Sequence, residues 1–114
     1  MALEFKVLEV GSIAAGASVD AEWTADADYT IKKLVFVERE DKTLSGVVGT
    51  MRIEEFVFTK DKVPISLFQG LYGEVPELDY PIDRGQTLYL SLTNEGTTDV
   101  YVYLVLAVER RGGG

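Results

Sequence analysis

Carboxylates are the side chains in this sequence that are numerous enough to do chemistry. The chain contains 19 Asp and Glu residues but no His and no Cys. Paired acids such as Glu54-Glu55, or Glu74 with Glu77, have the composition of the acid and base used in glycoside hydrolysis. A nucleophilic triad needs a base, usually His, and phosphate-binding loops need glycine motifs that are missing here. Because so many carboxylates form pairs by chance, we expect no catalytic site and no enzyme.

Metal binding has one candidate, the pair Asp26 and Asp28. A Ca²⁺ site needs six or more oxygen ligands, and no EF-hand spacing surrounds this pair. The absence of Cys and His also removes the usual zinc ligands. We therefore interpret Asp26-Ala27-Asp28 as an Asx turn between two strands, and we expect neither a metal nor a cofactor.

Aromatic side chains are the second group with binding potential. A platform that stacks on sugar rings could be built from Trp23, Tyr72, Tyr89, Tyr101 and Tyr103. Trp23 alternates in phase with apolar neighbours, which predicts core packing for it. Tyr101 and Tyr103 lie on one face of the last predicted strand, and Val105 and Ala107 continue that face. Val100, Val102 and Leu104 lie on its other face. A last strand that is apolar on both faces is either central in its sheet or contacts a second surface.

Period-two alternation of apolar residues defines the elements that must position these side chains. It predicts strands at 3–8, 19–24, 29–38, 47–53, 78–82, 88–93 and 100–108, with a turn at 11–16. The residues from 88 to 110 resemble a long antiparallel hairpin with its turn at 94–99. The centre of the third strand is apolar on both faces, which predicts a central position in its sheet. A bulge or tight corner at Glu54-Glu55 is expected to turn Phe56 and Phe58 inward.

The segment from Val63 to Pro76 differs in kind from the strands. It contains two prolines and two glycines among several apolar residues. We predict an irregular crossing with one short strand at 65–68. Two interpretations of its apolar side chains remain open, a lid on one end of the fold and a contact with a neighbouring subunit.

About eight strands at ten-residue spacing, with no helix, predict an all-β fold. We expect a two-sheet antiparallel sandwich that is jelly-roll-like, with an immunoglobulin-like sandwich as the alternative. At 114 residues the chain forms one domain. That domain is expected to span residues 1–111, followed by a flexible glycine tail at 112–114.

Charge and hydropathy exclude several classes of partner. The net charge is −8, and the basic pairs are Lys32-Lys33 and Arg110-Arg111. Binding to a phosphate backbone needs clustered cations, so we expect no direct nucleic acid and no membrane partner. No apolar run suits a signal peptide or a membrane helix, which predicts synthesis in the cytoplasm. Abundant Glu with few Asn, Gln, Cys and Met favours a thermophilic source.

Three stretches carry a resemblance to a known group of proteins. They are 47–53, the crossing at 58–64, and Pro81 to Leu88, which has the pattern Pro-x-x-x-Gly-x-x-Leu and leads to a strand ending in Thr93-Asn94. In this pattern the chain resembles the small single-jelly-roll structural proteins of viruses and phages. The resemblance implies a capsid, turret or decoration subunit that works through contacts, located in a virion or another assembly.

The sequence thus predicts a non-enzymatic structural subunit that self-associates, as a trimer or pentamer within a larger assembly. The contact residues that we predict are Phe68, Leu71, Tyr72, Tyr101 and Tyr103. The alternative is a β-sandwich module that binds carbohydrate or another ligand, with Tyr72 or Tyr89 stacking on a ring.

Overall fold

The computed structural model describes residues 3–57, 62–70 and 75–111 of the chain. Within these ranges strands alternate with short connections and one 3₁₀ turn. The elements are β1 (Leu3–Ile13), β2 (Ser18–Thr24), β3 (Tyr29–Glu38), β4 (Val47–Ile53), β5 (Phe56–Val57), β6 (Val63–Pro64), η1 (Ile65–Phe68), β7 (Tyr80–Ile82), β8 (Thr87–Asn94) and β9 (Val100–Arg110).

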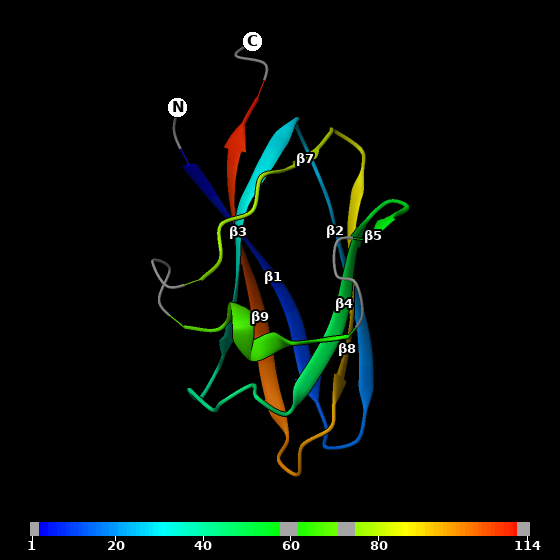
Figure 1. Ribbon diagram of the computed structural model, residues 1–114, viewed down its shortest axis with the longest axis vertical. Helices are drawn as coiled ribbons and strands as arrows, with labels where there is room; N and C mark the ends of the chain where they lie inside the picture. The colour runs from blue at the N-terminus through cyan, green and yellow to red at the C-terminus, as the bar shows by residue number, and fades with distance from the viewer. Residues whose placement is uncertain (1–2, 58–61, 71–74, 112–114) are drawn as a thin grey trace.

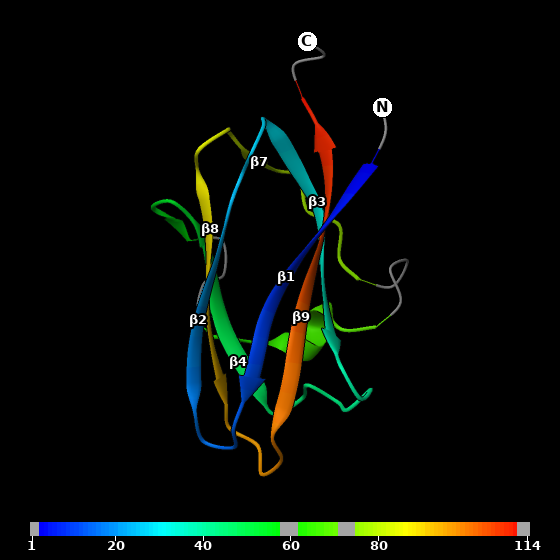
Figure 2. The same ribbon diagram turned by 180° about the vertical axis from the view of Figure 1, so that it is seen from behind.

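The strands form two antiparallel sheets packed face to face (Figures 1 and 2). The four-stranded sheet has the order β1-β9-β3-β7, and the other has the order β2-β8-β4-β5, with β6 also paired to β4. The predicted all-β, two-sheet antiparallel sandwich is therefore confirmed. The third predicted strand, β3, lies between β9 and β7, so its central position is confirmed as well.

The connectivity is that of a jelly roll. The strands pair as in one long antiparallel hairpin, whose turn lies between β4 and β5. Its paired arms are β4–β5, β3–β7, β2–β8 and β1–β9, and successive pairs wrap alternately into the two sheets. This eight-strand wrapping distinguishes a jelly roll from the immunoglobulin-like alternative.

The predicted terminal hairpin is wrong, because β8 and β9 belong to different sheets. Strand β8 pairs with β2 and β4, whereas β9 pairs with β1 and β3. The alternating pattern predicts that each strand has one buried face, but it does not predict which strands pair with each other. The polar residues 95–99 carry the chain across the end of the sandwich instead of turning it within one sheet.

Strand β1 is longer than predicted, since Gly11 is a bulge and not the start of a turn. Its φ is +101°, and the register with β9 shifts between Glu9 and Gly11. Glycine adopts this backbone region without steric cost, so the strand bends there and continues to Ile13.

Two further local predictions need correction. Residues Ile65–Phe68 form the 3₁₀ turn η1 and not a strand. Its two buried side chains, Ile65 and Phe68, are three residues apart, which is the repeat of a 3₁₀ helix. At Glu54-Glu55 the expected tight corner exists, because Ile53 pairs directly with Phe56. Phe56, however, points to solvent and is exposed, and Phe58 lies outside the described residues.

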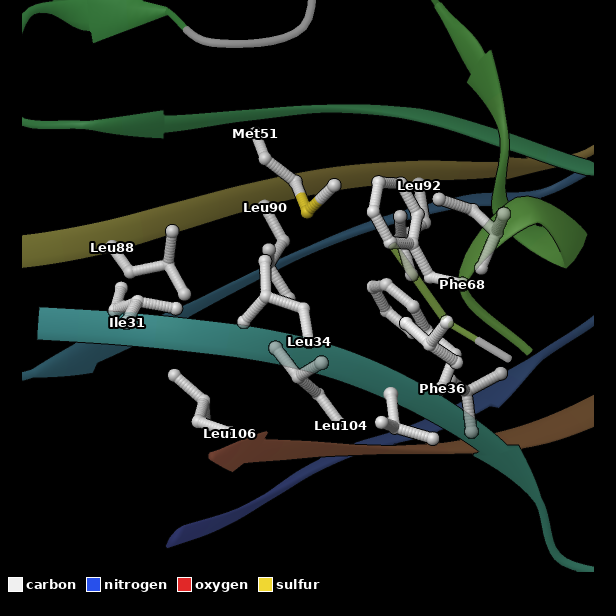
Figure 3. Packing of buried hydrophobic residues seen from close by; sticks show 14 of the residues in the cluster. Ile31, Leu34, Phe36, Met51, Phe68, Leu88, Leu90, Leu92, Leu104 and Leu106 are labelled. Atoms are coloured by element: carbon white, nitrogen blue, oxygen red, sulfur yellow. The ribbon is translucent and has the colours of Figure 1, made fainter. Parts of the chain in front are cut away.

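The core lies between the two inner sheet faces (Figure 3). Leu34 and Phe36 of β3 and Leu104 of β9 point toward Met51 of β4 and Leu90 of β8. All five side chains are almost fully buried. The inner positions of β4, β8 and β9 repeat with period two, as the sequence predicts, whereas register shifts interrupt the period in β1 and β3.

Two buried polar side chains hold the ends of the sandwich together. Glu38 accepts hydrogen bonds from the backbone N–H groups of Glu40, Lys42 and Tyr101, at 2.6, 3.0 and 2.7 Å. The amide of Asn94 donates to the carbonyl oxygens of Ile13 and Thr98, and its oxygen accepts the N–H of Gly96. Each side chain thereby joins a connection to a strand of the four-stranded sheet.

Candidate interaction surface

The outer face of the four-stranded sheet carries most of the exposed hydrophobic side chains. Seven large hydrophobic residues are exposed in the described ranges, and four of them lie on this face. They are Leu3, Phe5 and Val7 of β1 and Val37 of β3; Phe5 is 57% exposed and Val7 is 65% exposed. A concentration of this kind is unusual on a soluble monomer.

Strand register makes these side chains contiguous. Val7 of β1 lies opposite Val105 of β9, which in turn lies opposite Val35 of β3. One rung further along, Phe5 lies opposite Ala107. Directly paired residues share a sheet face, so the apolar row runs unbroken across three strands. We call the set Leu3, Phe5, Val7, Val35, Val37 and Val105 the apolar face.

Tyr101 and Tyr103 lie on the same outer face, at one end of the apolar face. Tyr103 is the direct neighbour of both Glu9 and Val37. The two tyrosine rings are 5.5 Å apart and tilted by 49°, and both residues are partly exposed. The row of Tyr101, Tyr103, Val105 and Ala107 predicted from the sequence is therefore formed, and β9 is also central in its sheet.

Charged groups surround the tyrosine pair. The guanidinium of Arg39 lies 4.0 Å from the centre of the Tyr101 ring. The Tyr101 hydroxyl donates a hydrogen bond to the carboxylate of Glu9. This bond, with a smaller contribution from desolvation, raises the pKa of Tyr101. The end of the apolar face is therefore amphipathic, with aromatic rings and paired charges.

Phe68, the one other predicted contact residue within the described ranges, does not join this surface. Phe68 is buried in the core, where its ring lies edge-on to Phe36 at 6.4 Å. Ile65 and Val75 are buried too and cover the core of their own subunit, whereas Leu67 of the same segment is exposed. Leu71 and Tyr72 lie outside the described residues.

Sequence reasoning missed Leu3, Phe5 and Val7 as surface residues. Their alternation was recognised as a strand, and period two correctly places them on one face. Leu8 and Val10 are apolar on the opposite side of the same strand, however, and these are the ones that pack against the core. The usable signal was the presence of apolar residues on both sides of β1.

The inward side of the N-terminal half of β1 carries charge. Glu4 forms ion pairs with Arg110 at 3.1 Å and with Lys6 at 3.4 Å. Hydrogen bonding to Arg110 lowers the pKa of Glu4. Lys6 also lies 3.9 Å from Asp26 and 5.4 Å from the centre of the Tyr29 ring. This edge of the sandwich is thus a mixed-charge cluster beside the apolar face.

The second sheet has a polar outer face. Arg52 and Glu22 flank Tyr89 in neighbouring strands, and the Arg52 guanidinium lies 3.9 Å from the centre of the Tyr89 ring. Asp20 and Ser91 pair on the next rung. These residues line an open groove of about 940 Å³, together with Leu8, Glu9 and Val10 of β1 and Val57 of β5. We call it the polar groove.

Several of the carboxylates singled out in the sequence have structural partners, and Glu74 lies outside the described residues. Glu54 accepts the backbone N–H of Thr87 at 2.6 Å, so it ties the β4–β5 turn to β8. Asp26 accepts the hydroxyl of Tyr29, and Asp28 accepts the backbone N–H of Arg84. Across the described ranges, acidic residues form no group of three or more that could hold a metal ion. In the same part of the chain no helix has the length and apolarity to cross a bilayer.

Comparison of the chain with protein-family models, with curated proteins and with solved structures gives no match. Function must therefore be inferred from the two outer faces of the sandwich, one apolar and one polar.

Proposed function

We propose that this chain is a non-enzymatic structural subunit that self-associates through the outer side of its four-stranded sheet. The observation that carries the proposal is the apolar face, in which Phe5 and Val7 remain more than half exposed beside other apolar side chains. Contiguous exposed apolar surface of this kind marks contact sites on soluble proteins.

The surroundings of the apolar face support a protein partner. Tyrosine and arginine are enriched in protein interfaces, and an apolar centre with a polar rim is their usual composition. Here Tyr101, Tyr103, Arg39 and Glu9 form such a rim at one end. Burial of Phe5 and Val7 against another subunit would gain about 25 cal/mol for each Å² of apolar surface removed from water.

The finer assignment is a virion shell or decoration protein. Jelly rolls serve as capsid domains, and the chain has a jelly-roll order of strands as well as a likeness in sequence pattern to small viral jelly-roll proteins. This part of the proposal depends on analogy at the level of the fold. The same fold also serves in lectins, so the outer faces must decide between the two roles.

The decisive measurement is the native mass by light scattering after size exclusion, over a wide range of protein concentration. We expect a closed oligomer or larger particle instead of the 12.6 kDa monomer. Val7→Lys places a charge in the middle of the apolar face and is expected to shift the mass toward the monomer. Val57→Lys is the matched control, because Val57 is similarly exposed but lies on the other sheet.

Two results would contradict the proposal. One is a monomer at every concentration. The other is an oligomer that Val7→Lys leaves intact and Val57→Lys disrupts, which would assign the contact to the second sheet.

The polar groove favours a second function, the binding of carbohydrate or a similar polar ligand. Tyr89 offers an aromatic ring, and Asp20 and Glu22 offer acceptors for hydroxyl groups. One side of the Tyr89 ring is already occupied by Arg52, which reduces the surface left for a sugar. We therefore rank this function second.

Intrinsic fluorescence across a panel of glycans tests the second function. A ligand of the groove is expected to change the emission of the chain, and Tyr89→Ala is expected to abolish that response. Tyr103→Ala, on the opposite outer face, is the control. A panel without any response would argue against the groove as a glycan site.

A further inference from the structure

Strand β1 is the outermost strand of the four-stranded sheet, with β9 as its neighbour in that sheet. A strand in this position presents alternate backbone N–H and C=O groups at the sheet edge, where another strand is able to pair. Toward its C-terminal end β1 bends at Gly11, and Leu8 to Val10 line one groove with Asp20 to Glu22 of β2. Figure 2 shows β1 and β2 diverging toward the N-terminal end of β1. The accessible part of the edge is therefore the N-terminal half.

We propose that this half of β1 pairs antiparallel with β1 of a second copy of the chain, with Phe5 opposite Phe5 across a two-fold axis. The inference depends on the proposed self-association and names one of its contacts. The partner is the same strand, so the contact is isologous and each residue is used twice.

The sequence of β1 specifies this register. With Phe5 on the axis, Glu4 lies opposite Lys6 of the second copy, and Lys6 lies opposite Glu4 of the second copy. On the other side of the strand, Leu3 lies opposite Val7 of the second copy. Within residues 3–7, each charged residue then meets its opposite and each apolar residue meets an apolar one. Cross-strand pairs of both kinds stabilise a sheet.

Neighbouring registers lack this complementarity. A neighbouring register that keeps the outer side chains on the outer face is reached by shifting one strand by two residues along the other. One such shift places Glu4 opposite Glu4 of the second copy. The shift in the other direction places Lys6 opposite Lys6 of the second copy. Like charges directly opposite each other destabilise the pair.

The charged side chains are available for this contact. The side chains of Lys6 and Glu4 are 27% and 32% exposed. Their partners within the subunit are Arg110, Asp26 and each other, so the cluster contains both signs and would accept a second mixed pair. A two-fold axis perpendicular to the sheet also keeps both apolar faces on the same side. Pairing therefore joins them into one larger apolar surface.

Two charge substitutions and their mixture test the register. Glu4→Lys alone makes both cross-strand pairs positive, and Lys6→Glu alone makes both negative. Each variant is expected to weaken self-association about tenfold at low ionic strength. In an equimolar mixture, each strand of one variant meets the opposite charges of the other. Light scattering is expected to show association of the mixture recovered to the level of the unaltered chain.

A cysteine pair provides a second readout that does not depend on charge. The chain has no Cys, so Phe5→Cys introduces a unique thiol. On the two-fold axis the two Cα atoms would be about 5 Å apart, within reach of a disulfide. Oxidation is expected to give a covalent dimer. The matched control, Val7→Cys, places its two thiols about 13 Å apart and is expected to stay monomeric on a non-reducing gel.

The outcomes separate this inference from the proposed function. If the unaltered chain associates but neither charge variant weakens it, the edge contact is refuted and self-association stands. If the mixture fails to recover, or if Val7→Cys forms disulfide dimers as readily as Phe5→Cys, the register is refuted. A chain that is monomeric at all concentrations refutes both.

Discussion

Val7 and Val105 lie directly opposite each other on the outer side of β1 and β9, and Val7 remains 65% exposed. A β-branched pair in this geometry is a favourable cross-strand contact within the sheet. It also creates apolar surface that the sandwich itself does not cover. The relationship explains why the four-stranded sheet is the side of the molecule most suited to a partner.

The tyrosine pair at the end of the apolar face provides the first prediction. Replacing Tyr101 and Tyr103 together with Ser is expected to weaken self-association about tenfold or more, because two aromatic contact residues are lost. The fold should persist, since both side chains lie on the outer face. Sedimentation velocity measures the association and circular dichroism the fold. Tyr89→Ser, on the other sheet, is the control, and an unchanged mass for the double variant would exclude these tyrosines from the contact.

Glu38 predicts a dependence of stability on pH. Burial raises the pKa of this carboxyl, but three backbone N–H donors outweigh that effect and lower the pKa below its ordinary 4.5. The ionised carboxylate therefore stabilises the fold fully above pH 4.5 and loses this contribution as the pH falls through the lower folded-state pKa. Glu38→Gln is expected to cost roughly 2 kcal/mol at neutral pH.

Urea unfolding at pH 7 and at pH 3 checks this prediction. The difference in unfolding free energy between the unaltered chain and Glu38→Gln should shrink at the lower pH. Glu40→Gln is the control, because the Glu40–Lys42 ion pair is exposed and contributes little. If the difference in unfolding free energy between the unaltered chain and Glu38→Gln is the same at both pH values, the ionised form of Glu38 is not what stabilises the fold.

Asn94 provides a prediction about the crossing between the sheets. Asn94→Ala leaves two carbonyl oxygens and one N–H without their partner, and should lower the unfolding free energy by about 2–3 kcal/mol. Thr93→Ala removes only an exposed hydroxyl contact to Ser18 and should cost much less. Chemical denaturation measures both. Equal losses of unfolding free energy in the two variants would mean that the Asn94 side chain does not stabilise the connection at 95–99.

Gly49 provides a prediction about packing in the second sheet. A Cβ at this position would lie 2.5 Å from Cδ2 of Leu92 and 2.6 Å from the backbone oxygen of Ser91. Because the second atom belongs to the backbone, rotation of a side chain does not relieve the clash. Gly49→Ala is expected to destabilise the protein by about 1–3 kcal/mol in thermal or chemical unfolding. Thr50→Ala is the neighbouring control, and an equal effect of both would refute the steric explanation.

Local patterns were sufficient for most of the strands. The bounds of β3 and β4 agree with the predicted ranges, because apolar residues between polar turns define them without reference to other strands. The same local information failed for η1, where a four-residue segment with three apolar side chains was short enough to suit either a strand or a 3₁₀ turn. It also failed at Gly11, because a glycine with positive φ serves equally in a turn and in a bulge.

The apolar face and the tyrosine pair at its end were only half visible in the sequence. Tyr101 and Tyr103 were identified because their row is apolar on a strand whose other side is also apolar. Phe68 was placed on the surface although it is buried, since the sequence does not reveal that Ile65 and Phe68 share one side of a 3₁₀ turn. Phe5 and Val7 were missed because either side of β1 could have faced the core.

The sequence by itself determined an all-β chain, the positions of its long strands and the absence of His and Cys, because composition and period-two alternation are local properties. Only the tertiary structure decided that β8 and β9 separate into different sheets, that β1 lies at an edge, and that Phe5, Val7 and Val105 form one outer face. Those relationships depend on pairing between residues up to about a hundred positions apart. Alternation specifies that a strand has two faces, but packing against the second sheet selects which one is buried.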